Sequence, residues 1–245
     1  MKIHILGCYS PFPSALGGTS GYLLQTEYGN ILIDCGSGVI HQLHKHIQAH
    51  KLDAVIISHT HADHISDLSV LKYAIDIPKH LGITKNSLTF YGPIELKSEY
   101  SKFEYKDSLI YQPICCNDRL NISGVDIVFC KTKHPVPCYA MKFTYHNKVI
   151  VYTADTEYCN EILNFATDAD LLIIEATMLE KDFKPDSGHL SARLAAELGH
   201  KANVKQLLLT HLWPYYSTDL ILQEAQQNFK GPITIASVGQ EYYIR

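Results

Sequence analysis

The sequence lacks the features that mark several large protein classes. It has no apolar run long enough to span a membrane and no Ser/Pro-rich or charge-block linker. Its first residues lack the long apolar stretch and small-residue cleavage site of a signal peptide. Its seven cysteines are odd in number and never spaced Cys-x-x-Cys, which makes a poor disulfide framework. We therefore expect a single cytoplasmic domain over residues 1–245 without a membrane partner.

An excess of positive charge is also missing. Lys and Arg total 21 against 25 Asp and Glu, which gives a net charge of −4 with neutral histidines. Neutralisation of phosphates supplies much of the affinity of proteins for nucleic acid. A broad nucleic-acid-binding surface is therefore not expected, and a phosphate-bearing substrate would have to be attracted by a local site.

One short segment carries most of the information that is present. Residues 59–64 read His-Thr-His-Ala-Asp-His and follow the apolar run 53–58, which is predicted to be a buried strand. Imidazoles and a carboxylate are costly to bury unless they bind something positive. His59 and His61 point the same way on an extended turn, whereas Asp63 and His64 begin the next helix. One metal ion would leave a side chain unused, and two would use all four, with zinc as the first candidate. The alternative is a polar turn whose histidines cap the helix, with Asp63 favoured near the helix N-terminus by the helix dipole.

The remaining pattern predicts alternating strand-rich and helical stretches in two successive halves. This indicates two sheets packed face to face with helices outside, an α/β fold of the αββα four-layer type. Strands are predicted over residues 2–6, 22–26, 30–34, 53–58, 125–132, 139–145, 148–153, 171–175, 206–210 and 233–237. Helices are predicted over residues 39–50, 62–80, 158–166, 191–200 and 218–229, with a short strand and a helix within 88–101.

Other apolar strands also end in a residue able to bind a metal. His134, Asp155, Glu175 and His211 each follow or close such a strand. If these strand ends meet at one edge of the fold, the side chains converge where sheet enzymes commonly place their sites. Each histidine alone is more often a structural residue than a ligand, but the shared position at strand ends favours a common site.

With these motifs the chain resembles the metallo-β-lactamase-fold hydrolase superfamily, and within it the branch of ribonuclease Z and related small phosphodiesterases. The motif at residues 59–64 matches in full, later ligand residues follow in the expected order, and Asp34 matches an early strand-end acid. The resemblance covers residues 31–213 and implies two divalent metal ions, zinc or manganese. It assigns His59, His61 and His134 to one ion, Asp63, His64 and His211 to the other, and Asp155 to a bridge between them.

Two further residues separate this branch from lactamases and thiolesterases. Glu175 opens a Glu-Ala-Thr segment and His189 belongs to a Gly-His segment. The resemblance implies that Glu175 orients His189, which then donates a proton to the leaving oxygen or stabilises charge on the phosphoryl group. The alternative makes Glu175 a strand-end acid in a salt bridge and His189 a neighbour of the helix cap at Ser191.

The chain also departs from the tRNA-processing enzymes of that branch. The stretch 13–18 lacks their basic residues, and the 20 residues between His134 and Asp155 leave no room for a basic arm. We therefore do not expect tRNA as a substrate and favour a smaller phosphodiester or an RNA end. The loop 17–21 is either a donor of N–H groups to a phosphate or a turn. The stretch 213–216, Trp-Pro-Tyr-Tyr, is either a wall on which a nucleobase stacks or part of a core or dimer contact.

These observations predict a dinuclear metal-dependent hydrolase that cleaves phosphodiesters through a metal-bridging hydroxide, with Asp63, His189 and Glu175 as catalytic residues. One alternative is an ester, lactone or thioester hydrolase that uses the same metals. Another is a non-catalytic, metal-stabilised nucleotide-binding module. The resemblance further implies a homodimer. Histidines 41, 44, 46 and 50 share one predicted helix, and we interpret them as surface residues rather than a second metal site.

Overall fold

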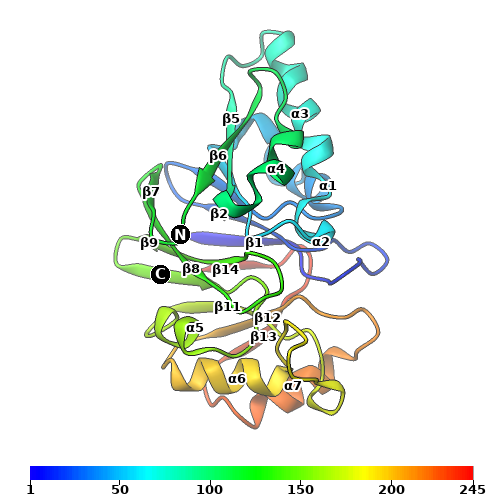
Figure 1. Cartoon of the computed structure of the whole chain (residues 1–245), viewed down its shortest axis with the longest axis vertical. Coiled ribbons are helices and arrows are strands. Elements are labelled where there is room, and N and C mark those ends of the chain that lie inside the picture. The colour runs from blue at the N-terminus through cyan, green and yellow to red at the C-terminus, as the bar shows by residue number, and fades with distance from the viewer. Residues whose placement is uncertain (245) are drawn as a thin grey trace. The chain divides into compact units, whose positions relative to one another are not determined.

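Two units, each centred on a seven-stranded mixed sheet, make up the computed structural model, which describes residues 1–244 (Figure 1). The first unit comprises Met1–Cys115, Ile122–Gly124 and Val238–Tyr243. The second comprises Cys116–Asn121 and Val125–Ser237 together with Ile244. The prediction of a single domain stays a prediction.

The sheet of the first unit has the strand order β14-β1-β2-β3-β4-β5-β6. Pairing is antiparallel from β14 to β3 and parallel from β3 to β6. Of the parallel strands, β3 and β4 are short and almost wholly buried apolar segments, as expected where both faces of a sheet are covered. The strands are β1 (Lys2–Gly7), β2 (Gly21–Gln25), β3 (Asn30–Ile33), β4 (Ala54–Ile56), β5 (Leu88–Pro93), β6 (Leu109–Ile114) and β14 (Glu241–Tyr243).

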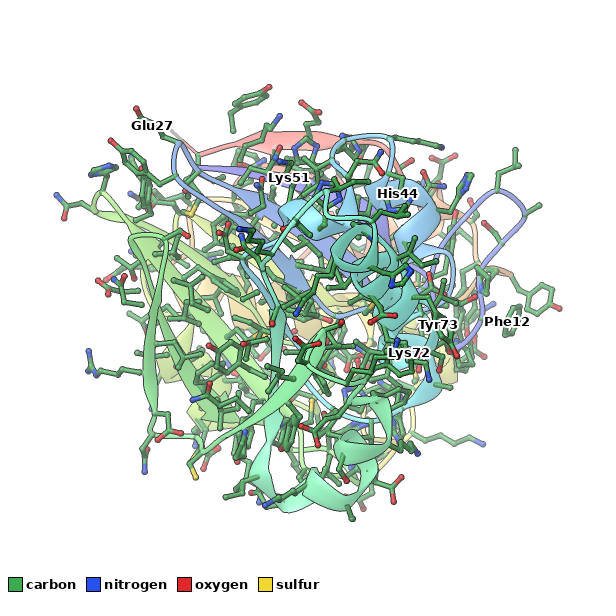
Figure 2. The ribbon with its side chains drawn as sticks, turned by 90° about the horizontal axis from the view of Figure 1, so that it is seen from above. Phe12, Glu27, His44, Lys51, Lys72 and Tyr73 are labelled. Carbon is green, nitrogen blue, oxygen red and sulfur yellow. The ribbon has the colours of Figure 1, made fainter. Side chains whose placement is uncertain are left out.

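Four α-helices and three 3₁₀ turns accompany this sheet. Apolar side chains of α1 and α3, such as Val39 and Leu71, join Leu6, Phe90 and Tyr111 of the strands in one buried cluster. On the exposed side of α3, the Lys72 ammonium lies 5.1 Å from the ring centroid of Tyr73 (Figure 2). The elements are α1 (Val39–Leu43), η1 (Ala49–Lys51), α2 (Ala62–Ile65), α3 (Leu68–His80), η2 (Ile94–Leu96), α4 (Lys97–Tyr100) and η3 (Ser101–Phe103).

The sheet of the second unit has the order β13-β12-β11-β10-β9-β8-β7. Its strands β10 to β13 are parallel, which brings the carboxyl ends of β10, β11 and β12 to one edge. The helices α6 and α7 lie side by side in this unit (Figure 1). The elements are β7 (Arg119–Ile122), β8 (Val125–Lys131), β9 (Tyr139–Tyr145), β10 (Lys148–Tyr152), α5 (Asn160–Phe165), β11 (Leu171–Glu175), η4 (Glu180–Asp182), α6 (Ala192–Lys201), β12 (Leu207–Thr210), α7 (Thr218–Gln226) and β13 (Ile233–Ile235).

Two predicted helices are wrong in extent. The helix predicted over 39–50 ends at Leu43, after which His46 N donates to Leu43 O in a tighter i→i+3 turn. The helix predicted over 62–80 is interrupted between α2 and α3, where Asp67 N donates to Cys35 O and the Asp67 carboxylate accepts the amide of Ile40. At Asp67 these tertiary hydrogen bonds override a continuous helical pattern.

Three strands were not predicted, namely β6, β7 and β14. Each lies at the end of a sheet. Edge strands are exposed on one side and tolerate polar residues and proline: β6 contains Pro113, and β7 alternates polar and apolar residues from Arg119. Such strands lack the continuous apolar run by which the central strands were recognised.

Over residues 1–244, none of the helices combines the length and the apolar character that crossing a membrane requires.

Candidate functional site

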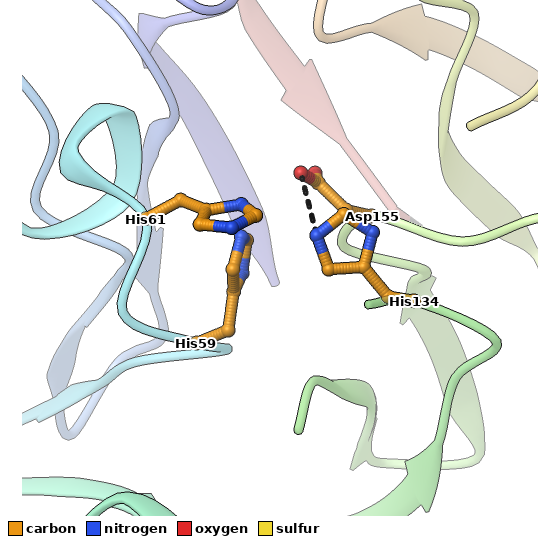
Figure 3. A group of neighbouring side chains, drawn as sticks. All are labelled: His59, His61, His134 and Asp155. Atoms are coloured by element: carbon orange, nitrogen blue, oxygen red, sulfur yellow. Dashed lines mark ion pairs between the residues drawn. The ribbon is translucent and has the colours of Figure 1, made fainter. Parts of the chain in front are cut away.

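The 59–64 segment lies directly after β4 in the first unit. His59 and His64 are fully buried, Asp63 is buried and His61 is partly exposed. The ring centroids of His59 and His61 are 4.6 Å apart, and both rings project to the same side of the segment (Figure 3). Asp63 and His64 lie in α2, whose first residue is Ala62. The unit therefore gathers four potential ligands in a single strand-to-helix turn.

A buried acid fixes the orientation of His64. Asp34 follows β3 in the left-handed conformation, with φ 55°, and its Oδ2 lies 2.8 Å from His64 Nδ1. The same carboxylate accepts the amide and the hydroxyl of Ser58, at 2.8 and 3.0 Å. A carboxylate accepts hydrogen bonds, so His64 carries its proton on Nδ1 and presents the lone pair of Nε2. Such support is characteristic of metal-binding histidines.

Gly36 is required by the same turn. A Cβ at residue 36 would lie 2.0 Å from the carbonyl oxygen of Asp63 and 2.2 Å from Thr19 Oγ1. The chain near residue 36 can therefore approach α2 because it has no side chain there. Ser10 also supports the turn, since its hydroxyl donates to Asp63 Oδ2 at 3.0 Å.

The second unit supplies the other three residues that the resemblance assigns to the metals. His134 follows β8, Asp155 follows β10 and His211 follows β12. His134 Nε2 lies 3.8 Å from Asp155 Oδ2 (Figure 3), and His211 Nε2 lies 3.1 Å from Asp155 Oδ1. The three strands thus bring both histidines to the two oxygens of one carboxylate.

Neighbouring groups set the protonation of both histidines. His134 Nδ1 lies 2.9 Å from the carbonyl oxygen of Gly188, which can only accept, so this nitrogen carries the proton. Thr177 donates its hydroxyl to Glu175 at 2.6 Å and therefore accepts from His211 Nδ1 at 2.8 Å. Burial is the main cause that lowers the pKa of His134, which favours the neutral form able to bind a metal.

This donor set fits a divalent cation. The Nε2 atoms of His134 and His211 face the two oxygens of the buried Asp155 carboxylate at 3.8 and 3.1 Å. Positive charge among these groups offsets the cost of burying the carboxylate. Imidazole nitrogen and carboxylate oxygen are the ligands that zinc and related metals take.

Glu175 and His189 form a pair beside these residues. Glu175, at the end of β11, is 1% exposed, and its Oε1 lies 3.2 Å from His189 Nδ1. Backbone amides of Thr156 and Leu190 donate to the same carboxylate at 2.7 and 3.0 Å. The His189 ring stacks on His211, with centroids 5.3 Å apart. The carboxylate is thus held rigidly and directs the His189 ring toward the Asp155 and His211 side chains.

The segment that carries His189 is fixed by a glycine. Gly188 has φ +81°, and a Cβ there would lie 2.7 Å from Pro135 Cδ and 3.2 Å from His134 Nδ1. Its amide donates to Glu157 Oε1 at 2.9 Å. A larger residue would disturb both His134 and the pair described above.

An open cleft of about 700 Å³ borders His189 in the second unit. Trp213 and Tyr216, whose rings stack with centroids 5.5 Å apart and an angle of 8°, contribute to its wall. Lys181 and Lys184 line it as well. The cleft therefore combines a flat aromatic surface with positive charge beside a histidine.

Sequence reasoning missed several supporting residues, namely Ser10, Ser58, Gly36, Thr177 and Glu157. Single serines, threonines and glycines have no distinctive sequence pattern, so the available signals were Ser58 directly before His59 and Thr177 at the end of the Glu-Ala-Thr segment. In the loop 17–21, the amides of Gly17 and Thr19 donate to Ser14 O and Ser37 O, so these two N–H groups have partners within the first unit.

Comparisons with known proteins agree over nearly the whole chain. A family model described as "Beta-lactamase superfamily domain" matches residues 29–212. The "Probable metallo-hydrolase YhfI" of Bacillus subtilis is 38% identical over 242 residues, which cover 98% of each protein. The crystal structure of this metallo-β-lactamase fold protein matches with a TM-score of 0.96 at 36% identity, covering 98% of both chains. Ribonuclease Z of Archaeoglobus fulgidus is 26% identical over 293 residues, covering 95% of this chain and 94% of its own.

Proposed function

The chain belongs to the β-lactamase superfamily and is a metallo-hydrolase of the metallo-β-lactamase fold, and from this premise we propose that it hydrolyses a small, nucleotide-like phosphodiester. The predicted family, its ribonuclease Z-like branch and the α/β fold class are thereby confirmed. The substrate class is our proposal.

The proposal assigns two divalent ions to the ligands that the family resemblance implies. Zinc is the first choice, because the donors are imidazoles and carboxylates. When bound, such ions act as Lewis acids and lower the pKa of a bound water molecule toward neutrality. The contacts of Nδ1 of His64, His134 and His211 with Asp34, Gly188 and Thr177 support the assignment, because they leave Nε2 of each ring to face the site. His59, His61 and His134 would hold one ion, Asp63, His64 and His211 the other, and Asp155 both.

The observation that carries a phosphodiesterase is the pair of Glu175 and His189. The carboxylate accepts from Nδ1, so the opposite nitrogen, Nε2, is the atom that delivers a proton. A nearby negative charge also favours a positive imidazolium ring. Such a group protonates the alkoxide that leaves phosphorus and offsets charge on the phosphoryl oxygens. The resemblance implies that this pair separates the ribonuclease Z-like branch from lactamases and thiolesterases.

The cleft beside His189 supports a nucleotide-like substrate. Nucleobases stack well on aromatic rings, and Trp213 with Tyr216 offers two parallel rings at the wall. Lys181 and Lys184 supply positive charge for phosphate. The chain's net charge of −4 argues against a large polyanion such as tRNA.

The first experiment measures hydrolysis of bis(p-nitrophenyl) phosphate by zinc- or manganese-loaded protein. We expect turnover by the wild type and its loss in Asp63→Ala. A screen of cyclic nucleotides, dinucleotides and RNA ends then follows. Hydrolysis of esters or thioesters by protein that holds two metals, without any phosphodiester cleavage, would overturn the proposal.

The role of His189 is tested by changing the leaving group. His189→Ala should lower kcat by about 10²–10⁴-fold for substrates with a poor alkoxide leaving group. The loss should be much smaller with p-nitrophenolate, which departs without a proton. Metal content, measured by mass spectrometry, should not change. The matched control is His200→Ala, an exposed histidine of α6. An equal loss for both leaving groups would contradict proton donation.

A further inference from the structure

A second group of metal-binding side chains lies in the first unit. His4 in β1, His46 in the turn after α1 and Glu241 in β14 each offer one ligand atom, and these atoms lie within 4.8 Å of one another. His4 and Glu241 are direct cross-strand partners in the antiparallel pair. The ring centroids of His4 and His46 are 4.2 Å apart. The three elements thus converge on one point, and the group shares no residue with the ligands named above.

A chain of hydrogen bonds determines which nitrogen of His4 carries the proton. Asn30 Nδ2 donates to the carbonyl oxygen of Lys51 at 3.1 Å, so its Oδ1 accepts from Gln25 Nε2 at 2.7 Å. The remaining atom of the Gln25 amide, Oε1, lies 2.5 Å from His4 Nε2. An amide oxygen can only accept, so the proton is on His4 Nε2. Nδ1 of neutral His4 therefore carries a lone pair.

That lone pair faces a second acceptor. His4 Nδ1 makes no hydrogen bond and lies 3.0 Å from Glu241 Oε1, while the side chain is 1% exposed. A positive charge between or beside this nitrogen and the carboxylate would offset the cost of bringing two acceptors so close. The separation is close to the ~3.3 Å expected between ligands of a tetrahedral zinc ion with bonds near 2.0–2.1 Å.

We propose that His4 Nδ1, His46 and Glu241 Oε1 bind a zinc ion at a site separate from the proposed catalytic centre. Two imidazoles and a carboxylate are zinc ligands, and a histidine that donates its other N–H to a fixed oxygen is typical of metal sites. The other oxygen of Glu241 is held by Tyr243 at 3.1 Å and Lys2 at 3.7 Å, which leaves Oε1 directed at His4. His46 is partly exposed and Glu241 is exposed, so water would complete the coordination.

The consequence of this site is structural. The ion joins the edge strand β14 to β1 and to the turn that follows α1. An edge strand of three residues has few backbone hydrogen bonds of its own, so a metal bond would stabilise its attachment. The inference uses residues that the proposed function does not, and it stands or falls independently of that function.

Zinc content tests the site. Metal-free full-length protein is refilled with zinc, freed of excess by gel filtration and analysed by mass spectrometry. His46→Ala and Glu241→Gln should each bind about one zinc ion fewer per chain than the wild type. The matched control is His44→Ala, an exposed histidine two residues away (Figure 2) that lies outside the cluster. Equal zinc content in wild type and both variants would overturn the proposal. The contact between His4 and Glu241 would then be an ion pair with a protonated His4.

Two further measurements separate this ion from the catalytic ones. The double variant with Asp63→Ala and His46→Ala should bind about one zinc ion fewer per chain than Asp63→Ala alone, because the two changes affect different sites. In cobalt-loaded protein, His46→Cys should keep the ion that His46→Ala loses. It should also add a sulfur-to-cobalt charge-transfer band, since thiolate is a metal ligand too. Absence of both the decrement and the band would exclude the site.

Discussion

At the scale of single residues, the candidate catalytic site depends on which ring nitrogen carries a proton. Asp34, Gly188 and Thr177 each accept from the Nδ1 of one histidine. His64, His134 and His211 therefore all present Nε2. Since a metal binds only an unprotonated nitrogen, these acceptors preorganise the ligands before any ion arrives.

Asp34→Asn tests this support. Asparagine tolerates the left-handed conformation of residue 34, so the backbone should be kept. An amide holds the His64 ring less firmly than a carboxylate does, and zinc affinity should fall about 10–100-fold with a parallel loss of activity. Isothermal titration with zinc measures the affinity. The control Asp219→Asn removes an exposed acid of α7 and should bind zinc as the wild type does. Unchanged affinity in Asp34→Asn would show that His64 needs no such support.

At the scale of elements, the sequence was informative where a strand is buried and apolar. The central strands of both sheets, such as β3, β11 and β12, were predicted within one or two residues of their observed bounds. The edge strands β6, β7 and β14 were missed because exposure on one side removes the apolar signal. The predicted helix through Asp67 was too long because the hydrogen bonds that interrupt it involve residues distant in sequence, whereas the one through His46 ends in a local turn closed on Leu43.

The candidate ligands could be recognised from sequence for a related reason. His134, Asp155 and His211 follow apolar strands of the second unit, and parallel pairing brings β10, β11 and β12 into register. Residue type and strand position together therefore indicate the group. The hydroxyl of Thr177 and the cluster of His4 with Glu241 depend on contacts that no local pattern encodes.

Asp170 fixes the parallel strands of the second unit to one another, and it gives a pH-dependent prediction. Its carboxylate accepts the amide of Val149 at 2.8 Å and the ammonium of Lys205 at 2.7 Å. Partial burial opposes ionisation, but these hydrogen bonds outweigh it and hold the pKa of Asp170 below its usual value of 3.8. The unfolded chain therefore takes up the proton more readily than the folded one does, and the stabilisation is present above pH 3.8 and lost below it.

We expect Asp170→Asn to lower the free energy of unfolding by about 1 kcal/mol at pH 7. The difference from the wild type should shrink as the pH falls below 3.8, because the wild-type carboxylate is then protonated. Urea unfolding of both proteins between pH 3 and 7 measures the difference. A gap that stays constant over this range would mean that the charge of Asp170 does not contribute.

At the scale of the whole molecule, metal binding should be coupled to stability. An ion that binds the folded chain at 100 times its dissociation constant adds about 2.7 kcal/mol. For a chain of this size, that corresponds to a rise in Tm of about 5–10 °C. Differential scanning calorimetry in EDTA and in a zinc series measures the rise. The rise should be smaller in Asp63→Ala, and a Tm independent of zinc in the wild type would contradict the coupling.

The pairing of β1 with β14 has a consequence for how the chain folds. His4 and Glu241 are direct partners although nearly the entire chain lies between them, and residues 125–237 within that span form most of the second unit. Closing so long a loop is entropically unfavourable, and non-local pairing of this kind slows folding. The loop becomes effectively short once the intervening unit has folded and its two ends are fixed. In the order of folding, β14 therefore attaches late, and its amides should be among the last to gain protection from hydrogen exchange.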